Sequence, residues 1–361
     1  MSHSAIALII FVVTCAASVA FIFKAKQLFN RLGLVDKPGP RRVHQVAVPR
    51  GLGVAIFLAF LVGVGISFVL PVERQAVETE RILLMVIACA IVVGVMLVDD
   101  AVSLGPGVKL AWQGVAASIV ILPRLNDSAR GIVIEQVNVP FVDTVALPLG
   151  VAVVGTFVWF IGLMNVMNWI DGLDGLAATV TLVACTILFV HTWFGPEGIP
   201  QFTISLLPLA LGAAIVGFLP FNWHPARVVM GDAGAMFLGL ALAIISIIGG
   251  AKMATALLTL GLPIADGLWV VFFRIIHGKS PLHADRGHLH HRLLDSGWDQ
   301  RAIVLTIGGL SLLFGIGALI LPNRELKAAL LIGVGLVLVG LIAYVAARSS
   351  NLVDNVKATG P

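Results

Sequence analysis

The feature that most constrains this chain is a series of long apolar stretches with few or no charged residues, each about the length of a membrane span. A helix that crosses the hydrocarbon core of a bilayer needs about 20 mostly apolar residues. The 361-residue chain has about eleven such stretches, approximately at 4–23, 53–71, 82–98, 109–123, 146–164, 175–194, 203–220, 233–249, 253–273, 302–321 and 327–347. Because a bilayer offers the backbone no water partners, each stretch is expected to be helical. The sequence therefore predicts an all-α polytopic membrane protein with about eleven transmembrane helices, and ten as the alternative count.

Composition excludes the other broad classes of protein. Hydrophobic residues make up 59% of the chain and charged residues only 12%, against about 45–50% and about 25% in ordinary soluble domains. A soluble enzyme, a disordered chain and a nucleic-acid-binding module are therefore excluded. The three cysteines lie inside apolar stretches and predict no disulfide framework. Since no repeat or linker is visible, residues 1–361 are expected to form a single integral-membrane domain.

The distribution of charge predicts the orientation in the membrane. With eleven spans, 16 of the 23 Lys and Arg residues fall on one side and all the Glu residues on the other. The positive-inside rule makes the basic side cytoplasmic. The first stretch has Lys24 and Lys26 after it and no basic residue before it, which predicts a retained span with an outer N-terminus and a cytoplasmic C-terminus. The outer loop at 124–145 alternates apolar and polar residues and predicts a small hairpin.

An acidic pair, Asp99 and Asp100, ends the third stretch, and Lys109 opens the fourth. Ionisable groups at membrane depth are costly, so they are candidates for function. Adjacent carboxylates repel each other and favour a nearby cation or a shared proton. The pair therefore suits holding a divalent ion or accepting a proton. The alternative is a polar stop at the end of a span.

A second polar group follows the fifth stretch. Asn165, Asn168 and Asp171 stand at positions i, i+3 and i+6, which share one face of a helix. Asp174 follows, and the glycines around it permit close approach of a ligand. We interpret this group as a ligand site. The alternative for Asp174 is to cap the next helix.

Two further groups lie on the same predicted face. Asp232 stands between glycines before an apolar helix and is either an N-cap or a ligand of a hard cation such as Mg²⁺. The segment 283–292 is rich in His and Arg, which suit phosphate oxygens; a zinc site and a basic amphipathic loop are the alternatives. Asp266, inside the ninth stretch, either faces the site or pairs with a buried neighbour.

Acidic groups for a divalent ion, a Lys and a His/Arg segment on one cytoplasmic face suit the handling of a diphosphate or nucleotide beside a lipid. Phosphoryl transfer depends on positioning and on neutralising phosphate charge. A transporter of an anionic or lipid-linked substrate is the alternative. Transporters usually place polar groups near the bilayer midplane and have internal repeats, and the sequence shows neither feature. A purely structural scaffold would not need these polar loops.

These motifs, in their order and loop positions, resemble the polyprenyl-phosphate N-acetylhexosamine-1-phosphate transferases (glycosyltransferase family 4). The type is similar to WecA/TagO, with MraY a more distant relative. The resemblance rests on the acidic pair, on NVMNWIDGLDG at 165–175, on MGDAG at 230–234, on the His/Arg segment 283–292, and on the upstream stretch from Leu34 that includes Arg50. It covers residues from about 34 to 300.

The resemblance implies transfer of an N-acetylhexosamine-1-phosphate from a UDP-sugar to undecaprenyl phosphate, with release of UMP. The group expected first among these is GlcNAc-1-phosphate. The alternative donors carry a deoxy-sugar, FucNAc or QuiNAc. The reaction would be the first membrane step of a cell-surface glycan pathway such as that of O-antigen, lipopolysaccharide or teichoic acid. The resemblance also implies dependence on Mg²⁺, with Mn²⁺ as a substitute, and a location in the bacterial inner membrane among its lipids. A homodimer is a further expectation.

The resemblance also assigns roles to residues. The implied catalytic residues are Asp99, Asp100 and Asp232, and the implied Mg²⁺ ligands are Asp232, Asp100 and Asp171. The implied substrate-binding residues are Arg50, Lys109, Asn165, Asn168, Asp171, Asp174, Arg286, His288, His290 and His291. Val229 stands where the family often has a Phe that stacks on uracil. A stacking ring must then come from elsewhere, with Phe221 and Trp223 as candidates.

Overall fold

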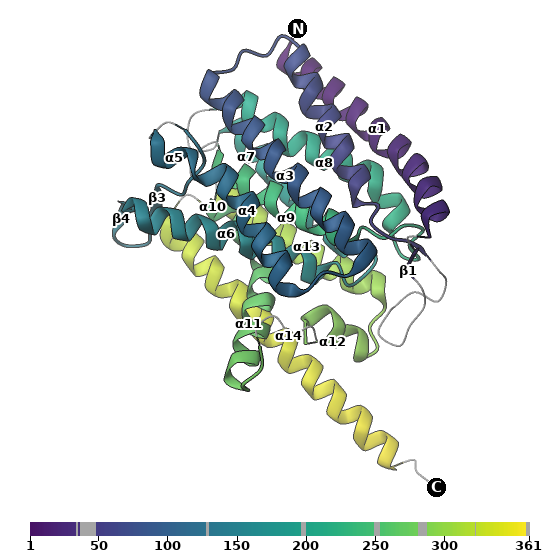
Figure 1. Cartoon of the computed structure of the whole chain (residues 1–361). Helices are drawn as coiled ribbons and strands as arrows, with labels where there is room; N and C mark the ends of the chain where they lie inside the picture. The colour runs from purple at the N-terminus through teal and green to yellow at the C-terminus, as the bar shows by residue number, and fades with distance from the viewer. Residues whose placement is uncertain are drawn as a thin grey trace.

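The computed structural model describes residues 1–33, 35–36, 48–127, 130–195, 200–248, 253–280, 287–321 and 323–358, and within these the protein is a bundle of long helices (Figure 1). The helices are α1 (His3–Leu32), α2 (Gly53–Val69), α3 (Ala76–Val102), α4 (Pro106–Ile121), α5 (Pro123–Asn126), α6 (Leu149–Ile170), α7 (Leu176–Phe194), α8 (Phe202–Asn222), α9 (Gly231–Ile248), α10 (Met253–Thr259), α11 (Gly261–Ile276), α12 (Leu289–Asp295), α13 (Gln300–Ile320) and α14 (Arg324–Ala358). The strands are β1 (Val35–Asp36), β2 (Val48–Pro49), β3 (Gln136–Val139) and β4 (Asp143–Ala146).

The predicted all-α polytopic fold is confirmed. Among the described residues, nine helices are long and apolar enough to cross a membrane, or ten if α10 and α11 count as one broken span. The apolar helix α2 is shorter, at 17 residues. With α2 included, every predicted stretch is helical. Large apolar side chains such as Leu8, Val154 and Val158 are exposed on the outward faces, as a bilayer environment requires.

The predicted ninth span is not one straight helix. It breaks at Leu260, and the axes of α10 and α11 differ by 74°. Pro263 lies in the first turn of α11, where it has no N–H to donate to the preceding turn. The break turns α11 away from α10, so that in Figure 1 α11 and α12 lie together at the lower end of the bundle.

The hairpin predicted in the 124–145 loop is present. Strands β3 and β4 pair antiparallel, with Gln136 opposite Ala146 and Val139 opposite Asp143. Phe141, in the turn, has a φ of 64°. The second strand pair was not predicted: β1 and β2 have two residues each, and such short segments leave no periodic signal.

Helix α9 is the centre of the bundle, with nearly all of its side chains buried among those of α2, α3 and α6. Its N-terminal end lies against the start of α2. Leu52 and Gly53 donate backbone hydrogen bonds to the carbonyls of Val229 and Met230, at 3.1 and 2.9 Å. A Cβ on Gly53 would lie only 2.1 Å from the Cα of Gly234. This glycine contact lets the segment before α2 reach the N-terminus of α9.

We predict that Gly53→Ala destabilises the protein. The added methyl group would overlap backbone atoms of α9, and overpacking of this kind costs about 1–3 kcal/mol. The thermal unfolding midpoint of the purified protein in detergent should therefore fall by several degrees. Gly94→Ala is the matched control, because a Cβ there meets nothing within 4 Å. A Gly53→Ala variant with the same thermal unfolding midpoint as the wild type would show that α2 and α9 are not in this close contact.

Candidate active site

Three predicted aspartates meet two predicted cations at one end of the bundle. Arg50 Nε lies 2.9 Å from Asp100 Oδ1, and its Nη2 lies 3.0 Å from Asp232 Oδ1. Lys109 Nζ lies 2.7 Å from Asp232 Oδ2 and also forms an ion pair with Asp99. Asp232 is therefore shared by both cations. Because α3, α4, α9 and the segment before α2 each supply a part, the five residues form one cluster.

The N-terminus of α9 holds Asp100. The backbone N–H groups of Asp232 and Ala233 donate to its carboxylate at 3.2 and 3.3 Å. A helix N-terminus carries partial positive charge and unpaired N–H groups, which favour an anion there. Gly231 has a φ of 76°, and a Cβ on it would lie 2.6 Å from Asp100 Oδ2. Glycine is therefore required for Asp100 to cap α9.

Burial separates the carboxylates from the cations. The side chains of Asp99 and Asp100 are only 3% and 4% exposed, and that of Asp232 is 13% exposed. Those of Arg50 and Lys109 are 32% and 23% exposed. An anion that approaches the cluster therefore meets the cations first. Burial tends to lower the pKa of Arg50, but Asp100 and Asp232 outweigh it and raise that pKa, so the guanidinium stays charged.

The two asparagines of α6 have different neighbours. Asn168 Nδ2 lies 3.5 Å from Asp232 Oδ2, at the edge of the cluster. Asn165 donates at 2.9 Å to Gln113 of α4, whose Nε2 lies 3.3 Å from the sulfur of Met236. On the predicted shared face of α6, Asn168 therefore reaches the cluster, whereas Asn165 lies about one helical turn further from it, beside Gln113. Gln113 was missed, because one uncharged polar residue in an apolar stretch is a weak signal.

Asp171 follows α6 and belongs to the same electrostatic cluster. Its pKa is raised well above the usual range, first by burial and then by repulsion from Asp232, with further repulsion from Asp100 and Asp174 and an opposing effect of Arg50. A carboxyl group in these surroundings either keeps its proton or gains a cation. With Asp171, the cluster has four carboxyl groups for two basic side chains.

Asp174 is buried and ties two loops together. Its Oδ2 lies 2.7 Å from His224 Nδ1 and accepts from the Ala226 N–H at 3.0 Å. Beside it, Asn222 accepts from the Gly175 N–H and donates to the Val228 carbonyl. These four contacts fix the loop after α6 against the loop before α9. The role of Asp174 in binding substrate stays a prediction.

The histidine-rich helix α12 lies against the loop after α6. A Cβ on Gly172 would lie 2.6 Å from His290 Nε2 and 3.1 Å from His291 Nε2. His288, just before α12, has its Nδ1 3.0 Å from Asp266 Oδ2. Of the two interpretations of Asp266, pairing with a buried neighbour is confirmed. Arg286 lies outside the described residues.

The predicted metal ligands do not form a preassembled site. In the part of the chain that the structure describes, no three His, Cys, Asp or Glu side chains stand close enough together to hold a metal ion. Asp100 and Asp232 are bridged by Arg50, and Asp171 interacts with them electrostatically, which raises its pKa. The donors are nevertheless all carboxylate oxygens, the ligands that Mg²⁺ prefers.

The candidate stacking rings lie near different elements. The ring of Phe221 packs edge-on against Phe23 of α1, with centroids 5.4 Å apart. The ring of Trp223 lies over Gly175, where a Cβ would be 3.3 Å from it. Trp223 therefore lies beside the loop that carries Asp171 and Asp174. Of the two candidates, it is the one that contacts this loop.

Comparisons with known proteins show the family of this chain. The model of the family described as "Glycosyl transferase family 4" matches residues 82–250. A Bacillus subtilis (strain 168) protein named "Probable undecaprenyl-phosphate N-acetylglucosaminyl 1-phosphate transferase" is 32% identical over 316 residues, which is 85% of this chain and 82% of the relative. The chain belongs to glycosyl transferase family 4. The resemblance seen in the motifs is therefore confirmed.

Two other relatives extend the comparison. A decaprenyl-phosphate N-acetylglucosaminephosphotransferase of Mycobacterium tuberculosis (strain ATCC 25618 / H37Rv) is 31% identical, over 85% of this family 4 protein and 81% of the relative. An undecaprenyl-phosphate alpha-N-acetylglucosaminyl 1-phosphate transferase of Salmonella typhi is 26% identical, over 82% and 79%. The family model includes Asp99, Asp232 and the block between them. Arg50 and His288 lie outside the matched residues. The structure brings Arg50 to the cluster and places His288 beside Asp266 and Trp169.

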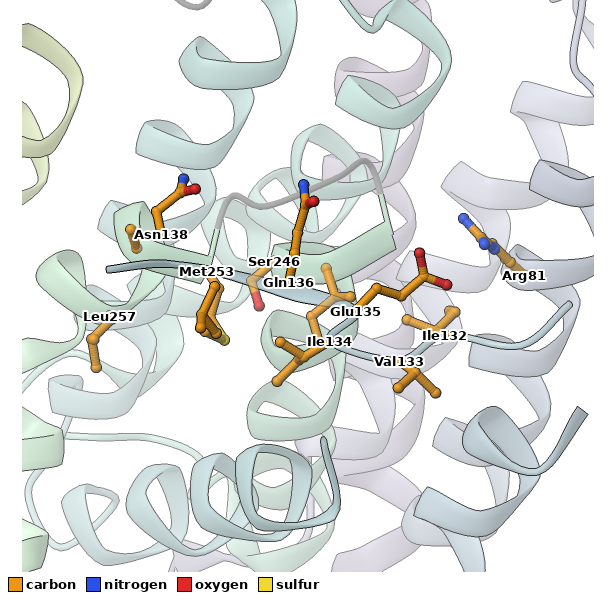
Figure 2. Close-up of a pocket in the computed structure, with 13 residues that line it drawn as sticks. Arg81, Ile132, Val133, Ile134, Glu135, Gln136, Asn138, Ser246, Met253 and Leu257 are labelled. Atoms are coloured by element: carbon orange, nitrogen blue, oxygen red, sulfur yellow. The ribbon is translucent and has the colours of Figure 1, made fainter. Parts of the chain in front are cut away.

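A separate pocket, drawn in Figure 2, has a volume of about 320 Å³. It is lined by Arg81 of α3, by 132–138, by Ser246 of α9 and by Met253 and Leu257 of α10. Arg81 and Asp99 are 18 residues apart on one helix, or about 27 Å at 1.5 Å per residue. The pocket therefore lies at the opposite end of the bundle, and no predicted site residue of this family 4 protein lines it.

We predict that Lys109→Met strongly destabilises the protein, because it leaves the buried carboxylates of Asp99 and Asp232 without this cation. Breaking a buried ion pair costs about 3–5 kcal/mol. Thermal unfolding in detergent should show a clear loss. Arg124→Met, which removes an ion pair to the more exposed Glu135, is the control; such pairs contribute about 0–1 kcal/mol. Equal losses in the two variants would contradict the prediction.

Proposed function

We propose that this protein transfers GlcNAc-1-phosphate from UDP-GlcNAc to a polyprenyl phosphate. The observation that carries the proposal is the cluster of buried carboxylates under two partly exposed cations, at one end of an apolar bundle. The names of the relatives support the donor and the acceptor, since they are undecaprenyl- or decaprenyl-phosphate N-acetylglucosamine phosphotransferases. For this chain the acceptor we propose is undecaprenyl phosphate.

The reaction exchanges one phosphoanhydride for another. A phosphate oxygen of the lipid bonds to the sugar-bearing phosphorus of UDP-GlcNAc, and the bond from that phosphorus to the bridging oxygen of UMP breaks. The products are polyprenyl-pyrophosphate-GlcNAc and UMP. Both reactants are anionic, so the site must neutralise charge and hold the two phosphates in line. Arg50 and Lys109 are the cations that phosphate oxygens meet first.

We assign each of the other residues to one of the two substrates, the lipid phosphate or the sugar nucleotide. Asp99 and Asp100 position the lipid phosphate, or accept its proton. Asn168, Asp171 and the loop fixed by Asp174 hold the nucleotide side. The remaining predicted binders are Asn165, Arg286, His288, His290 and His291, and the histidines and Arg286 are proposed for the diphosphate.

We propose Mg²⁺ as the cofactor, held by Asp100, Asp171 and Asp232. The residues fit this ion, because four carboxyl groups surround two basic side chains and all the donors are oxygens. When bound, Mg²⁺ would neutralise the diphosphate charge. Mn²⁺ is the proposed substitute.

The cluster is proposed to face the cytoplasm, with the N-terminus outside and the protein in the bacterial inner membrane. The sorting of Lys and Arg to one side of the predicted spans supports this orientation. A role in the first membrane step of a cell-surface glycan pathway and a homodimeric state are parts of the same proposal. The deoxy-sugar donors are less favoured than UDP-GlcNAc, because the relatives' names specify N-acetylglucosamine.

The purified protein should release UMP from UDP-GlcNAc only when undecaprenyl phosphate is present. A panel of UDP-sugars, including the FucNAc and QuiNAc donors, tests the choice of sugar under the same conditions. Chelation with EDTA should stop turnover, Mg²⁺ should restore it, and Mn²⁺ should restore part of it. If no donor is turned over, the proposed reaction is wrong. Full turnover in EDTA would disprove only the proposed dependence on a divalent metal ion.

Asp232→Asn should lower kcat at least about 100-fold, the scale seen when one charge-stabilising group is lost. Asp232 contacts both cations, so its carboxylate charge organises the site. UMP release at saturating substrates is the measurement. Glu80→Gln is the control, since Glu80 lies at the other end of α3 and pairs with Arg130. An Asp232→Asn variant with wild-type kcat would remove Asp232 from the mechanism.

A further inference from the structure

Asp266 is a buried carboxylate that the proposed chemistry does not use. It lies on α11, within the broken span, and its side chain is 5% exposed. A carboxylate at this depth is costly unless it has partners. Its Oδ2 lies 3.0 Å from His288 Nδ1, and its Oδ1 accepts from the Leu289 N–H at 2.9 Å. Both oxygens are therefore committed to the start of α12.

The two contacts differ in what they require. Capping the Leu289 N–H needs only one acceptor oxygen, which an asparagine also supplies. The contact with the ring nitrogen determines which nitrogen of His288 carries a proton and how the ring is oriented. When Nδ1–H donates to Asp266, Nε2 remains as the nitrogen available to a ligand. In the protonated ring, Nε2–H then donates to an anion.

A second contact from α11 supports the same ring. His288 stacks on Trp169, with centroids 5.5 Å apart and planes 28° from parallel. Trp169 in turn packs over Gly267, where a Cβ would lie 2.8 Å from the indole. Two adjacent residues of α11 therefore contact this pair of rings: Asp266 contacts His288, and Gly267 contacts Trp169. Gly267 has no side chain to separate Trp169 from the helix.

This assembly adjoins the carboxylate cluster through α6. Trp169 directly follows Asn168, whose Nδ2 lies 3.5 Å from Asp232, and Asp171 is two residues further on. The ring of His290 stacks on that of His288 at 5.9 Å and reaches Gly172. His288 is thus held beside the loop that is proposed to bind the nucleotide.

We propose that Asp266 is a positioning residue that orients His288 toward the diphosphate of the sugar-nucleotide donor. The proposal rests on the proposed function, and it adds a residue that acts only through His288. Asp266 is not a ligand of the substrate. Loss of its carboxylate should weaken donor binding and leave the fold intact.

The test uses the full-length protein with Asp266→Asn, His288→Gln and the double variant. Asp299→Asn is the matched control, because Asp299 caps α13 through Arg301 and Ala302 and does not contact a histidine in the described part of the chain. One readout is KM and kcat for UDP-GlcNAc. The other is the ¹⁵N signal of His288 in histidine-labelled protein, assigned by its loss in His288→Gln.

Asp266→Asn is expected to raise the KM for UDP-GlcNAc about 10-fold, the scale typical for losing an outer partner of a functional histidine. The His288 ¹⁵N signal should shift, and Asp266→Asn should have no further effect on KM in the His288→Gln background. The Asp299→Asn control should change neither readout. A merely structural role would instead lower the amount of active enzyme at unchanged KM.

Three results would overturn the proposal. They are an unchanged His288 signal in Asp266→Asn, an unchanged KM in that variant, and a full additional KM effect in the His288→Gln background. Absence of turnover in the wild type would instead refute the proposed reaction. The ¹⁵N signal would then still decide whether Asp266 orients His288.

Discussion

The site depends on one shared carboxylate. Asp232 binds Arg50 through one oxygen and Lys109 through the other, and these cations in turn hold Asp100 and Asp99. Because the four partners come from three separate parts of the chain, Asp232 links elements that are distant in the sequence. The backbone supports this link, since α9 can begin beside Asp100 only with glycine at 231. Packing and charge therefore fix the same junction.

The arrangement of charge also explains how an acidic cluster can receive anionic substrates. The carboxylates are buried and the basic side chains are half-buried above them. Each cation is held in place by carboxylates and still has part of its surface available. Preorganised charge of this kind costs no reorganisation when phosphate arrives. Asp171 adds a fourth carboxyl group, and its raised pKa means that it either keeps its proton or requires a further cation.

Most of the fold and part of the site followed from the sequence. Span length predicted the helices because a bilayer permits few alternatives. The cost of charge at membrane depth predicted Asp99, Asp100, Lys109 and Asp232, and the structure brings all four together. The break at Leu260 was missed, since hydropathy does not report a change of axis. The partners Gln113 and His224 were also missed, because single polar residues show their role only once distant loops are placed.

The position of the charges along the chain has a consequence for how the protein is made. Arg50, Asp99, Asp100 and Lys109 all precede the end of α4. This N-terminal part contributes two acidic and two basic residues to the site. The formal charges of these four residues sum to zero when this part enters the membrane. Asp171 and Asp232 arrive later, with α6 and α9, and add two carboxyl groups to the cluster. The half-built protein thus carries a balanced set of charges, and the demand for another cation arises only when the bundle is complete.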